Sequence, residues 1–483
     1  MTFATDHGGS ATTHDIVVVG AGVVGCAVAW ALTKAGRRVL LIDRADPATA
    51  GASFGNVGHV ATEQLQPLPS PQLLLSFWRE LVAFGGVLDI PLRRVAVMAP
   101  WMVRFALAAF QQRSHTQHLA PLVRGAADVL GARLCEVGRS DLLRRNGHYM
   151  LWFGPKATAQ SAAERARASK LGIATNDAPV ELLRAAAIAA AHGHNVMAGK
   201  PAAAAPLISS APLEANAATN GVSTGPAPPA RATPAPAAPP LVTQPAPAHP
   251  ANPGVAGVWF PDTAHVLDPA HVARAFASAS VQAGASVLRA SVLHMRPQGE
   301  RIEIVTDTSS LSVRTAVICA GVWSAPFLAS FGIHAPLEAE RGYHVELSDH
   351  APLVDAPILY ADHSIVITPM ASRLRASTYL EFAGLDAPAD PDKPTRLRTK
   401  LRQLGYRCDI QGASWMGARP TLPDYLPGIG RAHGPHELFY AVGHQHLGLT
   451  LAAVTADVIA DLVVGRAPRF DVKAFDLHRF GAP

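Results

Sequence analysis

Three glycines near the start of the chain have the spacing needed to bind a pyrophosphate. Gly20, Gly22 and Gly25 form a G-x-G-x-x-G pattern within residues 15–44, between a β-favouring run and a helix-favouring run. The first glycine permits a tight turn, the second lets the pyrophosphate approach the backbone, and the third lets the helix pack on the strand. The phosphates would then meet the free N–H groups at the start of the helix.

A carboxylate stands where a dinucleotide fold needs one. Asp43 ends the second β-favouring run, eighteen residues after Gly25, where a side chain is expected to accept the ribose hydroxyls. An acidic residue here argues against a ribose 2′-phosphate. A purely structural turn is the alternative for an isolated glycine pattern, but strand, helix and carboxylate together favour nucleotide binding. NAD and FAD are both open from this pattern alone.

A polar loop follows the fingerprint closely. The stretch "ASFGNVGH" (52–59) brings Ser53, Asn56, two glycines and His59 into eight residues. Such a loop either connects two elements or forms the floor of a reaction site. The residue types by themselves leave both readings open.

The elements that must position these residues come in separated pieces. Strand–helix alternation marks both ends and the centre of the chain, and strand-rich material dominates residues 335–416. This order predicts an α/β domain assembled from separate segments, with a second α+β domain inserted into it. Residues 201–250 contain 16 alanines and 13 prolines. Because repeated proline blocks helix and sheet and the segment has little to bury, we expect a disordered surface insertion.

Several stretches, in this order along the chain, resemble the FAD-dependent oxidoreductases of the D-amino-acid oxidase superfamily. Within it the sequence is similar to bacterial D-amino-acid dehydrogenases, and among these to D-hydroxyproline/D-proline dehydrogenases. The resemblance spans nearly the whole chain except the first dozen residues and the Ala/Pro-rich segment. It is carried by the glycine fingerprint, "ASFGNVGHV" (52–60), "GVWFPDTAHVLDP" (257–269), "AVICAGVWS" (316–324), "ERGYHVEL" (340–347), "WMGARPTLPDYLPGIG" (415–430) and "GHQHLGLT" (443–450).

This resemblance implies a discontinuous Rossmann-like FAD-binding domain of α/β class with an inserted α+β substrate-binding domain. The FAD-binding portions are expected at residues 14–90, 255–332 and 418–475. The substrate-binding portions are expected at residues 91–191, mainly helical, and 333–417, rich in strands. The disordered Ala/Pro-rich insertion is expected at residues 192–254.

The resemblance also implies a bound FAD. In related sarcosine oxidases a cysteine in the motif near residue 419 bonds the flavin covalently, whereas this chain has Ala418, Arg419 and Pro420, so non-covalent FAD is expected. The residues expected to hold it are Gly20, Gly22, Gly25, Asp43, Arg44, Ser53, Asn56, Val57, Gly58, Ala320, Gly321, Gly443, Gly448, Leu449 and Thr450.

Four further residues are candidates for handling an amino-acid substrate. A carboxylate is best held by the planar fork of an arginine, and the resemblance assigns that role to Arg419; a structural arginine between the domains is the alternative. His446 stands where some amine-oxidising relatives have a second basic residue, which leaves room for a pH-dependent contact. His59 and Tyr343 complete the set, with a turn-capping histidine and an ordinary sheet residue as their alternatives.

Composition narrows the class of protein. The net charge of +5 comes without dense Lys/Arg stripes, which argues against nucleic acid and suits an anionic cofactor, an anionic substrate or loose contact with a membrane surface. The four cysteines form no CxxC pair, which argues against a disulfide framework or zinc site and fits a reducing cytoplasm. The histidines of "HGH" (192–194) and His249 fall at the insertion, so no metal is expected.

No signal peptide is readable in the first thirteen residues, and a cytoplasmic location is expected. The stretch "PWMVRFALAAF" (100–110) is apolar enough for peripheral contact at the inner face of the cell membrane, although a buried amphipathic helix is the favoured interpretation.

The expected function is therefore FAD-dependent dehydrogenation of a D-amino acid to the imino acid. The substrate preferred by the resemblance is D-proline or 4-hydroxy-D-proline, with electrons passed to a quinone or another carrier. One alternative is an oxidase that uses oxygen and acts on glycine, sarcosine or another secondary amine. The other is a non-catalytic flavoprotein subunit, against which the presence of Arg419 argues.

Overall fold

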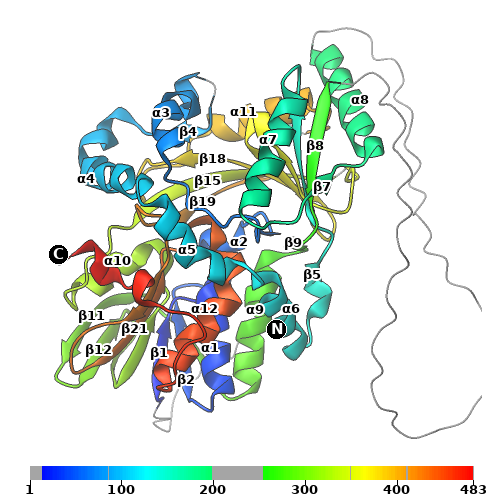
Figure 1. The fold of residues 1–483 in the computed structure, drawn as a ribbon. Helices are drawn as coiled ribbons and strands as arrows, with labels where there is room; N and C mark the ends of the chain where they lie inside the picture. The colour runs from blue at the N-terminus through cyan, green and yellow to red at the C-terminus, as the bar shows by residue number, and fades with distance from the viewer. Residues whose placement is uncertain (1–13, 85, 198–253, 349, 409–411, 482–483) are drawn as a thin grey trace, which may run out of the picture.

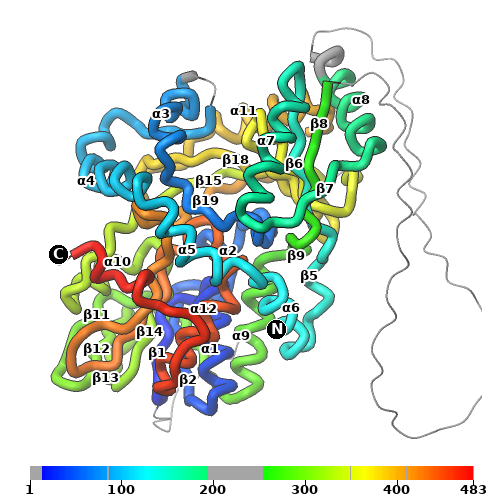
Figure 2. Tube along the Cα trace, viewed as in Figure 1, coloured from blue at the N-terminus to red at the C-terminus, as the bar shows by residue number. Residues whose placement is uncertain are grey.

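The computed structural model of the chain describes residues 14–84, 86–197, 254–348, 350–408 and 412–481. Figure 1 shows a lower part that carries the glycine fingerprint and an upper part built on a second sheet. The tube in Figure 2 shows that both parts mix colours from distant parts of the chain, so each is assembled from separate segments. Residues 198–253, which include most of the expected insertion, lie outside the described residues.

The lower part is built on a mostly parallel sheet with the strand order β10-β2-β1-β14-β21-β20. All of its strands run parallel except β20, which is antiparallel to β21. The bounds are β1 Ile16–Val19, β2 Val39–Asp43, β10 Ser286–Arg289, β14 Thr315–Ile318, β20 Gly428–Arg431 and β21 Glu437–Val442.

Both faces of this sheet are covered, which explains why its strands are apolar without alternation. Ile16 and Val18 join the core under α1 (Val23–Lys34), α9 (Pro269–Gln282) and α12 (Gly448–Val463), whereas Val17 and Val19 join a core on the other face. The other face is covered by a small sheet and by α10; the bounds are β11 Val292–Gln298, β12 Arg301–Thr306, β13 Ser310–Val313 and α10 Ser324–Ala329.

One segment of the described chain, Gln445–Val463, is long and apolar enough to cross a membrane by length and composition alone. It includes α12, and 67% of it is buried inside the protein. Its contacts with α1 and α6 make it a core helix of the lower part.

The upper part is built on a mixed sheet with the order β19-β15-β18-β17-β16-β6-β8-β7, and β4 pairs with β18. The strand bounds are β4 Leu88–Asp89, β6 His148–Phe153, β7 Asn176–Asp177, β8 Val255–Phe260, β15 Glu338–Leu347, β16 Ile358–Tyr360, β17 Ile365–Pro369, β18 Leu374–Glu381 and β19 Ser414–Thr421.

Helices surround this upper sheet, and short elements link the two parts (Figure 1). The helices of the upper part are α3 Pro71–Glu80, α4 Leu92–Ala109, α7 Ala157–Lys170, α8 Val180–Met197 and α11 Asp392–Gln403. Two further helices, α5 Gln112–Val123 and α6 Ala126–Glu136, follow α4 in the chain and pack on α12 of the lower part. The linking elements are α2 Gly51–Phe54, β3 His59–Val60, β5 Leu143–Arg144 and β9 Ala264–Val266.

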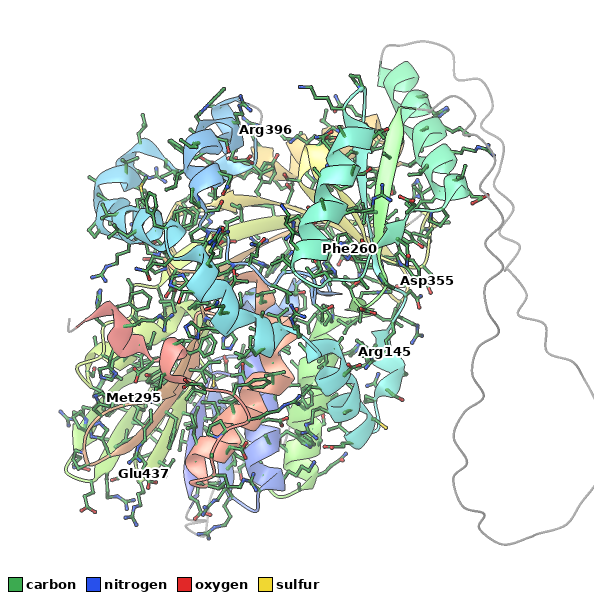
Figure 3. All side chains as sticks on the ribbon, viewed as in Figure 1. Arg145, Phe260, Met295, Asp355, Arg396 and Glu437 are labelled. Atoms are coloured by element: carbon green, nitrogen blue, oxygen red, sulfur yellow. The ribbon has the colours of Figure 1, made fainter. Side chains whose placement is uncertain are left out.

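The expected fold class, a discontinuous α/β domain with an inserted α+β domain, is confirmed. The expected boundaries need three corrections. β8 pairs with β6 in the upper sheet, so the lower part resumes after Phe260 and not at residue 255. Figure 3 labels Phe260 at the end of this strand. α8 continues to Met197, past the expected start of the insertion at residue 192.

The third correction concerns α5 and α6, which were expected within the substrate domain. Their apolar residues Leu119, Leu130 and Leu134 belong to the core under α1 and α12. An amphipathic pattern predicts that a helix has a buried face, but not which sheet it will cover. The amphipathic pattern therefore predicts that α5 and α6 form, but not that they pack on the core of the lower part.

Buried charges stabilise the upper sheet. The Lys393 side chain is 2% exposed, and its Nζ lies 2.6 Å from Glu381 Oε1, 2.6 Å from Asp89 Oδ2 and 3.1 Å from Asp390 Oδ2. Arg341, fully buried, approaches the second oxygen of Glu381 at 2.8 Å. This cluster joins α11 to β4, β15 and β18.

We expect Lys393→Met to destabilise the protein strongly. Removing one partner of a buried ion pair leaves the other charges uncompensated, at a typical cost of about 3–5 kcal/mol. Chemical unfolding of the flavin-loaded protein would measure this loss. The matched control is Arg38→Met, which breaks the exposed pair with Asp15 and should change the free energy of unfolding far less. Equal losses in the two variants would contradict the assignment.

Candidate active site

The fingerprint turn lies where two parallel strands end. Gly20 has φ +106°, and a Cβ there would lie 2.4 Å from the Cys319 carbonyl oxygen at the end of β14. A Cβ on Gly25 would lie 1.8 Å from the Gly20 carbonyl oxygen. Both positions therefore require glycine, because backbone occupies the space a side chain would need. The start of α1 is thereby held against the sheet with its N–H groups directed outward.

Two polar side chains fix this turn from outside. Asp43 Oδ2 accepts a hydrogen bond from the Ala21 N–H at 2.6 Å, and Ser53 Oγ accepts one from the Val23 N–H at 3.0 Å. Ser53 thus caps an N–H group at the start of α1, which the sequence did not predict. Asn56 Oδ1 accepts from the Gly58 N–H at 2.7 Å, so it also shapes its own loop.

A cavity of about 530 Å³ extends from this turn to the upper sheet. Most residues expected to hold the cofactor line it: Gly20, Gly22, Asp43, Arg44, Ser53, Asn56, Val57, Ala320, Gly321, Gly448 and Leu449. Three of the substrate candidates also line it: Tyr343, Arg419 and His446. Folding therefore brings together residues that are up to about 430 positions apart in the chain, as long-range sheet pairing allows.

Other expected cofactor residues shape the cavity without lining it. Gly25 packs on Gly20, and Gly58, at φ +81°, lies where a Cβ would meet the Val266 carbonyl oxygen at 2.8 Å. Gly443 makes room for the Leu422 side chain. The Thr450 hydroxyl accepts from the Ala61 N–H at 3.0 Å, which ties α12 to the strand after the polar loop.

Arg419 lies on the wall of the cavity contributed by the upper sheet. Its Nη1 donates to Glu340 Oε1 at 2.8 Å, and the Glu340 carboxylate is fully buried. Tyr425 and Thr421 donate their hydroxyls to the other Glu340 oxygen at 2.8 and 3.1 Å. The guanidinium lies over Gly342, where a Cβ would come within 2.2 Å of Nη2. One edge of the arginine fork is thus anchored, and the side chain, 22% exposed, faces the cavity.

Tyr343 lines the cavity, but its hydroxyl is engaged in the upper sheet. Its hydroxyl donates to Glu381 Oε2 at 2.7 Å and accepts from Arg341 Nη2 at 3.1 Å. Because successive strand residues point to opposite faces, the side chain of Tyr343 points away from the face on which Gly342 meets Arg419. Tyr343 therefore belongs to the buried charge cluster, and the cavity is lined at this point by the backbone of β15.

His446 reaches the cavity from the loop before α12, and its Nε2 is hydrogen bonded to Gln64 Oε1. The pKa of His446 is lowered to about 4, mainly by burial; Glu340 raises it in part and Arg419 lowers it. The imidazole is therefore neutral at neutral pH. The pH-dependent contact that the sequence left open would fall well below the neutral range.

His59 lies elsewhere. It lines a second, smaller cavity together with Glu63, Gln64 and His148, and it does not line the large one. Sequence reasoning missed Glu340, Gln64 and His148 as partners of the site. The "GHVATEQ" spacing of His59, Glu63 and Gln64 was a local signal that could have drawn attention to this group.

The large cavity fits a flavin dinucleotide. The glycine turn accommodates a pyrophosphate, since any side chain at Gly20 would collide with the backbone, and the Asp43 carboxylate stands at the end of β2, where a ribose is expected. Gly448 and Leu449, at the start of α12, also line the cavity. The positive end of the helix dipole would there favour negative charge on a flavin ring. The cavity is continuous from the fingerprint turn to Arg419.

Comparison with known proteins identifies the protein family. Residues 15–206 and 231–462 match the family of FAD-dependent oxidoreductases called DAO. The chain is 26% identical to a D-amino-acid oxidase of Bradyrhizobium diazoefficiens, over 96% of this chain and 98% of that one. It is also 26% identical to a D-amino acid dehydrogenase of Cereibacter sphaeroides, over 97% of this chain and 96% of that one.

Solved structures agree on the fold. Glycine oxidase from Geobacillus kaustophilus has a TM-score of 0.64 at 19% identity and covers 96% of this chain and 98% of its own. L-proline dehydrogenase from P. horikoshii has a TM-score of 0.60 at 14% identity, with 97% of each chain covered. The chain belongs to the DAO family of FAD-dependent oxidoreductases. It is therefore an FAD-dependent oxidoreductase.

The buried histidines around the site predict loss of stability in acid. Burial lowers the pKa of His265, which is fully buried, from 6.5 to about 4. Between these two pH values the unfolded chain binds a proton that the folded chain does not, so the stability is complete above about pH 6.5 and is lost as the pH falls toward 4.

For His265 alone, linkage gives a loss of about 2 kcal/mol by about pH 5. The His265→Leu variant should therefore lose less free energy of unfolding than the wild type between about pH 7.5 and pH 5. Chemical unfolding at the two pH values, with FAD in excess, measures the difference. An identical pH dependence in both proteins would show that His265 is protonated in the folded state.

Proposed function

We propose that this enzyme dehydrogenates small or cyclic D-amino acids, with D-proline or 4-hydroxy-D-proline preferred, and passes the electrons to a quinone or another carrier. The observation that carries the proposal is the Arg419 fork, which is anchored on one edge by buried Glu340 and open to the cavity on the other. The D-amino-acid substrates named for two relatives support the stereochemistry. The cyclic substrate rests on the sequence resemblance.

The geometry suggests how the residues would act. Arg419 would clamp the substrate carboxylate with the donors that Glu340 does not use. Because His446 is neutral at neutral pH, it adds no second positive charge, so the clamp depends on one arginine. FAD, when bound, supplies the acceptor for the hydride from the substrate Cα. The protein's contribution is orientation of the Cα–H bond and exclusion of water.

We propose that FAD is held without a covalent bond. The motif at residues 418–420 offers no cysteine. Cys319 lines the cavity near the fingerprint, but it is buried and burial raises the pKa of its thiol, so it stays protonated and unreactive.

A second candidate is an oxidase that uses oxygen and acts on glycine, sarcosine or another amine. It is favoured by the relative named D-amino-acid oxidase, since that name implies oxygen as the acceptor. The two candidates share Arg419 and differ in what reoxidises the flavin. A non-catalytic flavoprotein subunit would have no need of an anchored arginine in the cavity.

Anaerobic titration of the purified holoenzyme tests the substrate. We expect D-proline and cis-4-hydroxy-D-proline to bleach the visible flavin band and sarcosine and glycine to leave it unchanged. Arg419→Met should lower kcat/KM by about 100-fold, since a charge-assisted clamp contributes up to about 3 kcal/mol. Air and a quinone analogue, supplied separately to reduced enzyme, identify the acceptor.

The matched control is Arg94→Met, which breaks a similar half-buried pair with Glu338 on the same strand but away from the cavity. It should retain kcat/KM within about threefold, because it removes no substrate contact. Equal effects of the two substitutions, or bleaching by sarcosine and glycine but not by the cyclic D-amino acids, would contradict the proposal.

We further propose a cytoplasmic location with peripheral contact at an anionic membrane surface through α3 and α4. These helices lie side by side in the upper part (Figures 1 and 2). They expose large apolar side chains, with Leu75 83%, Leu107 60% and Phe110 75% exposed, beside exposed Arg79 and Arg113. Apolar side chains flanked by arginines suit the headgroup region of anionic lipid. The residues of α4 that face inward, such as Met98 and Trp101, are buried, as the interpretation favoured by the sequence, an amphipathic helix with a buried face, expected.

Flotation with vesicles that contain phosphatidylglycerol tests this contact. We expect the wild type to float and Leu107→Glu/Phe110→Glu to remain in solution, because each glutamate removes apolar area and adds repulsion. The control Ile188→Glu changes a similarly exposed apolar side chain on α8, 56% exposed and away from both cavities. A wild type that stays in solution with these vesicles would refute the contact.

A further inference from the structure

A second cavity of about 160 Å³ lies beside the active site and has no role in the mechanism above. Its polar lining consists of His59, Glu63, Gln64, His148, Glu164 and Arg167, and its apolar lining of Met150, Pro357, Leu359 and Val366. Gln64 connects the two cavities, since its Oε1 is hydrogen bonded to His446 on the wall of the large one. The small cavity is therefore one side chain away from the substrate site.

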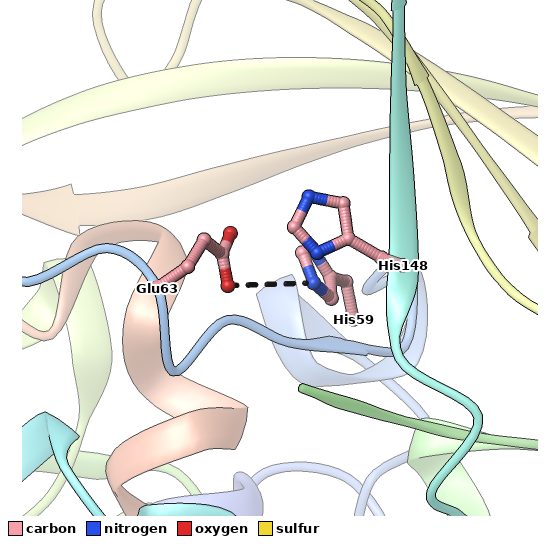
Figure 4. A group of neighbouring side chains, drawn as sticks. All are labelled: His59, Glu63 and His148. Carbon is pink, nitrogen blue, oxygen red and sulfur yellow. Dashed lines mark ion pairs between the residues drawn. The ribbon is translucent and has the colours of Figure 1, made fainter. Parts of the chain in front are cut away.

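Three side chains converge in this cavity from two segments of the chain, His59 and Glu63 from β3 and the turn after it and His148 from β6 (Figure 4). His59 Nε2 and Glu63 Oε2 are 3.7 Å apart, and the rings of His59 and His148 have centroids 4.6 Å apart. Each of the three residues offers a nitrogen or oxygen atom, and these atoms lie within 4.8 Å of one another. His148 is held in place by a contact of 3.2 Å between its Nδ1 and the Thr263 hydroxyl and by stacking on Phe260.

Two of these polar atoms lack a hydrogen-bond partner. The side chains of His59 and Glu63 are only 9% and 5% exposed, yet His59 Nε2 and Glu63 Oε2 have no hydrogen bond to any residue that the structure describes. A buried polar atom left unsatisfied costs about 1–3 kcal/mol. Such a cost is typical of a site that a ligand completes.

The cavity has no net charge at neutral pH. Burial lowers the pKa of His59 to about 3 and raises the pKa of Glu63 to about 8, and it also lowers the pKa of His148. Glu164 and Arg167, the other charged residues of the lining, pair with each other at 2.5 Å. The three converging groups are thus two neutral imidazoles and a carboxylic acid, which together offer both hydrogen-bond donors and acceptors.

This arrangement fits a neutral polar group better than a metal ion. A divalent cation would need Glu63 ionised, and with Glu164 already paired to Arg167 it would leave a net positive charge in a buried site. A hydroxyl group needs only one acceptor and one or two donors, all of which the cluster supplies without ionisation.

We propose that the small cavity is a hydroxyl-binding subsite of the substrate pocket. In it, His59, Glu63 and His148 hold a hydroxyl carried on the ring or side chain of the amino acid whose carboxylate lies on Arg419. This inference rests on the proposed function, because it takes Arg419 as the carboxylate clamp. It predicts that the enzyme prefers 4-hydroxy-D-proline, and hydroxylated D-amino acids in general, to their unsubstituted counterparts.

The expected effect is a preference within matched pairs of compounds. In the wild type, kcat/KM should be about 10- to 100-fold higher for the hydroxylated member, since a site built to bond a hydroxyl leaves buried polar atoms unpaired when the hydroxyl is missing. The first pair is cis-4-hydroxy-D-proline and D-proline, in which the hydroxyl is replaced by hydrogen. The second pair is D-threonine and D-valine, in which the hydroxyl is replaced by a methyl group.

Variants of the subsite should remove the preference. Glu63→Met keeps the length of the side chain and deletes its polar atoms, so it should lower kcat/KM for the hydroxylated member alone, whereas Glu63→Gln, which keeps a donor and an acceptor, should restore most of the preference. His148→Met should act like Glu63→Met. The control is His436→Met, because His436 is a buried histidine with unpartnered ring nitrogens that lies against Phe331 and away from both cavities.

The outcomes separate the subsite from the proposed function. Loss that is equal for both members of a pair, or a wild type without the preference, would overturn the subsite even if the enzyme oxidises D-amino acids. One equivalent of bound metal in the wild type that is absent from Glu63→Met would overturn it in favour of a metal site.

If no member of either pair reduces the flavin, the proposed function fails. Binding measurements with the same compounds then test whether the subsite exists. Dissociation constants come from perturbation of the flavin spectrum by each compound. Tighter binding of the hydroxylated member in the wild type, lost in Glu63→Met, supports the subsite, and equal binding overturns it.

Discussion

The ion pair between Glu340 and Arg419 is the interaction on which the active site depends. The two residues lie directly opposite each other in the register of β15 and β19. Glu340 is fully buried and would be costly to hold ionised without Arg419 and the hydroxyls of Tyr425 and Thr421. The same pairing requires glycine at position 342, since the guanidinium occupies the space of a side chain. The folding of the upper sheet itself thus fixes the arginine that we propose as the substrate clamp.

The cofactor cradle obeys a constraint of the same kind in the lower sheet. There the backbone at the ends of β1 and β14 comes too close for any side chain at Gly20. Ser53 and Asp43 then hold the turn through backbone N–H groups. Each half of the site is therefore fixed by contacts around its own sheet, and the polar loop at residues 52–59 and the loop before α12 both contribute to the cavity between them.

The features of the site that could be predicted from the sequence are those whose residues lie close together in the chain. Gly20, Gly22, Gly25 and Asp43 lie within a single βαβ unit, so their spacing alone predicts their geometry. The role of Arg419 was proposed from the family resemblance, because the residues next to it in the sequence do not distinguish it from a structural arginine. Its partner Glu340 is 79 residues away and becomes a neighbour only when β15 pairs with β19.

Other features could not be predicted from local sequence patterns for the same reason. Tyr343 was expected in the substrate site, but strand alternation turns its hydroxyl toward Glu381 once the register is set. His148 meets His59 only because β6 and β3 are brought together by folding. The faces that α5 and α6 cover likewise depend on tertiary packing, which an amphipathic pattern does not specify.

The central claim is that Arg419 holds the substrate carboxylate beside the flavin. The most direct measurement is a crystal structure of the holoenzyme that has been reduced chemically and then soaked with D-proline, which cannot be oxidised when the flavin is already reduced. The account predicts both carboxylate oxygens at hydrogen-bond distance, about 2.7–3.0 Å, from the Arg419 guanidinium, with Glu340 still bound to its other edge. A carboxylate bound elsewhere in the cavity, for example on Arg44, would contradict it.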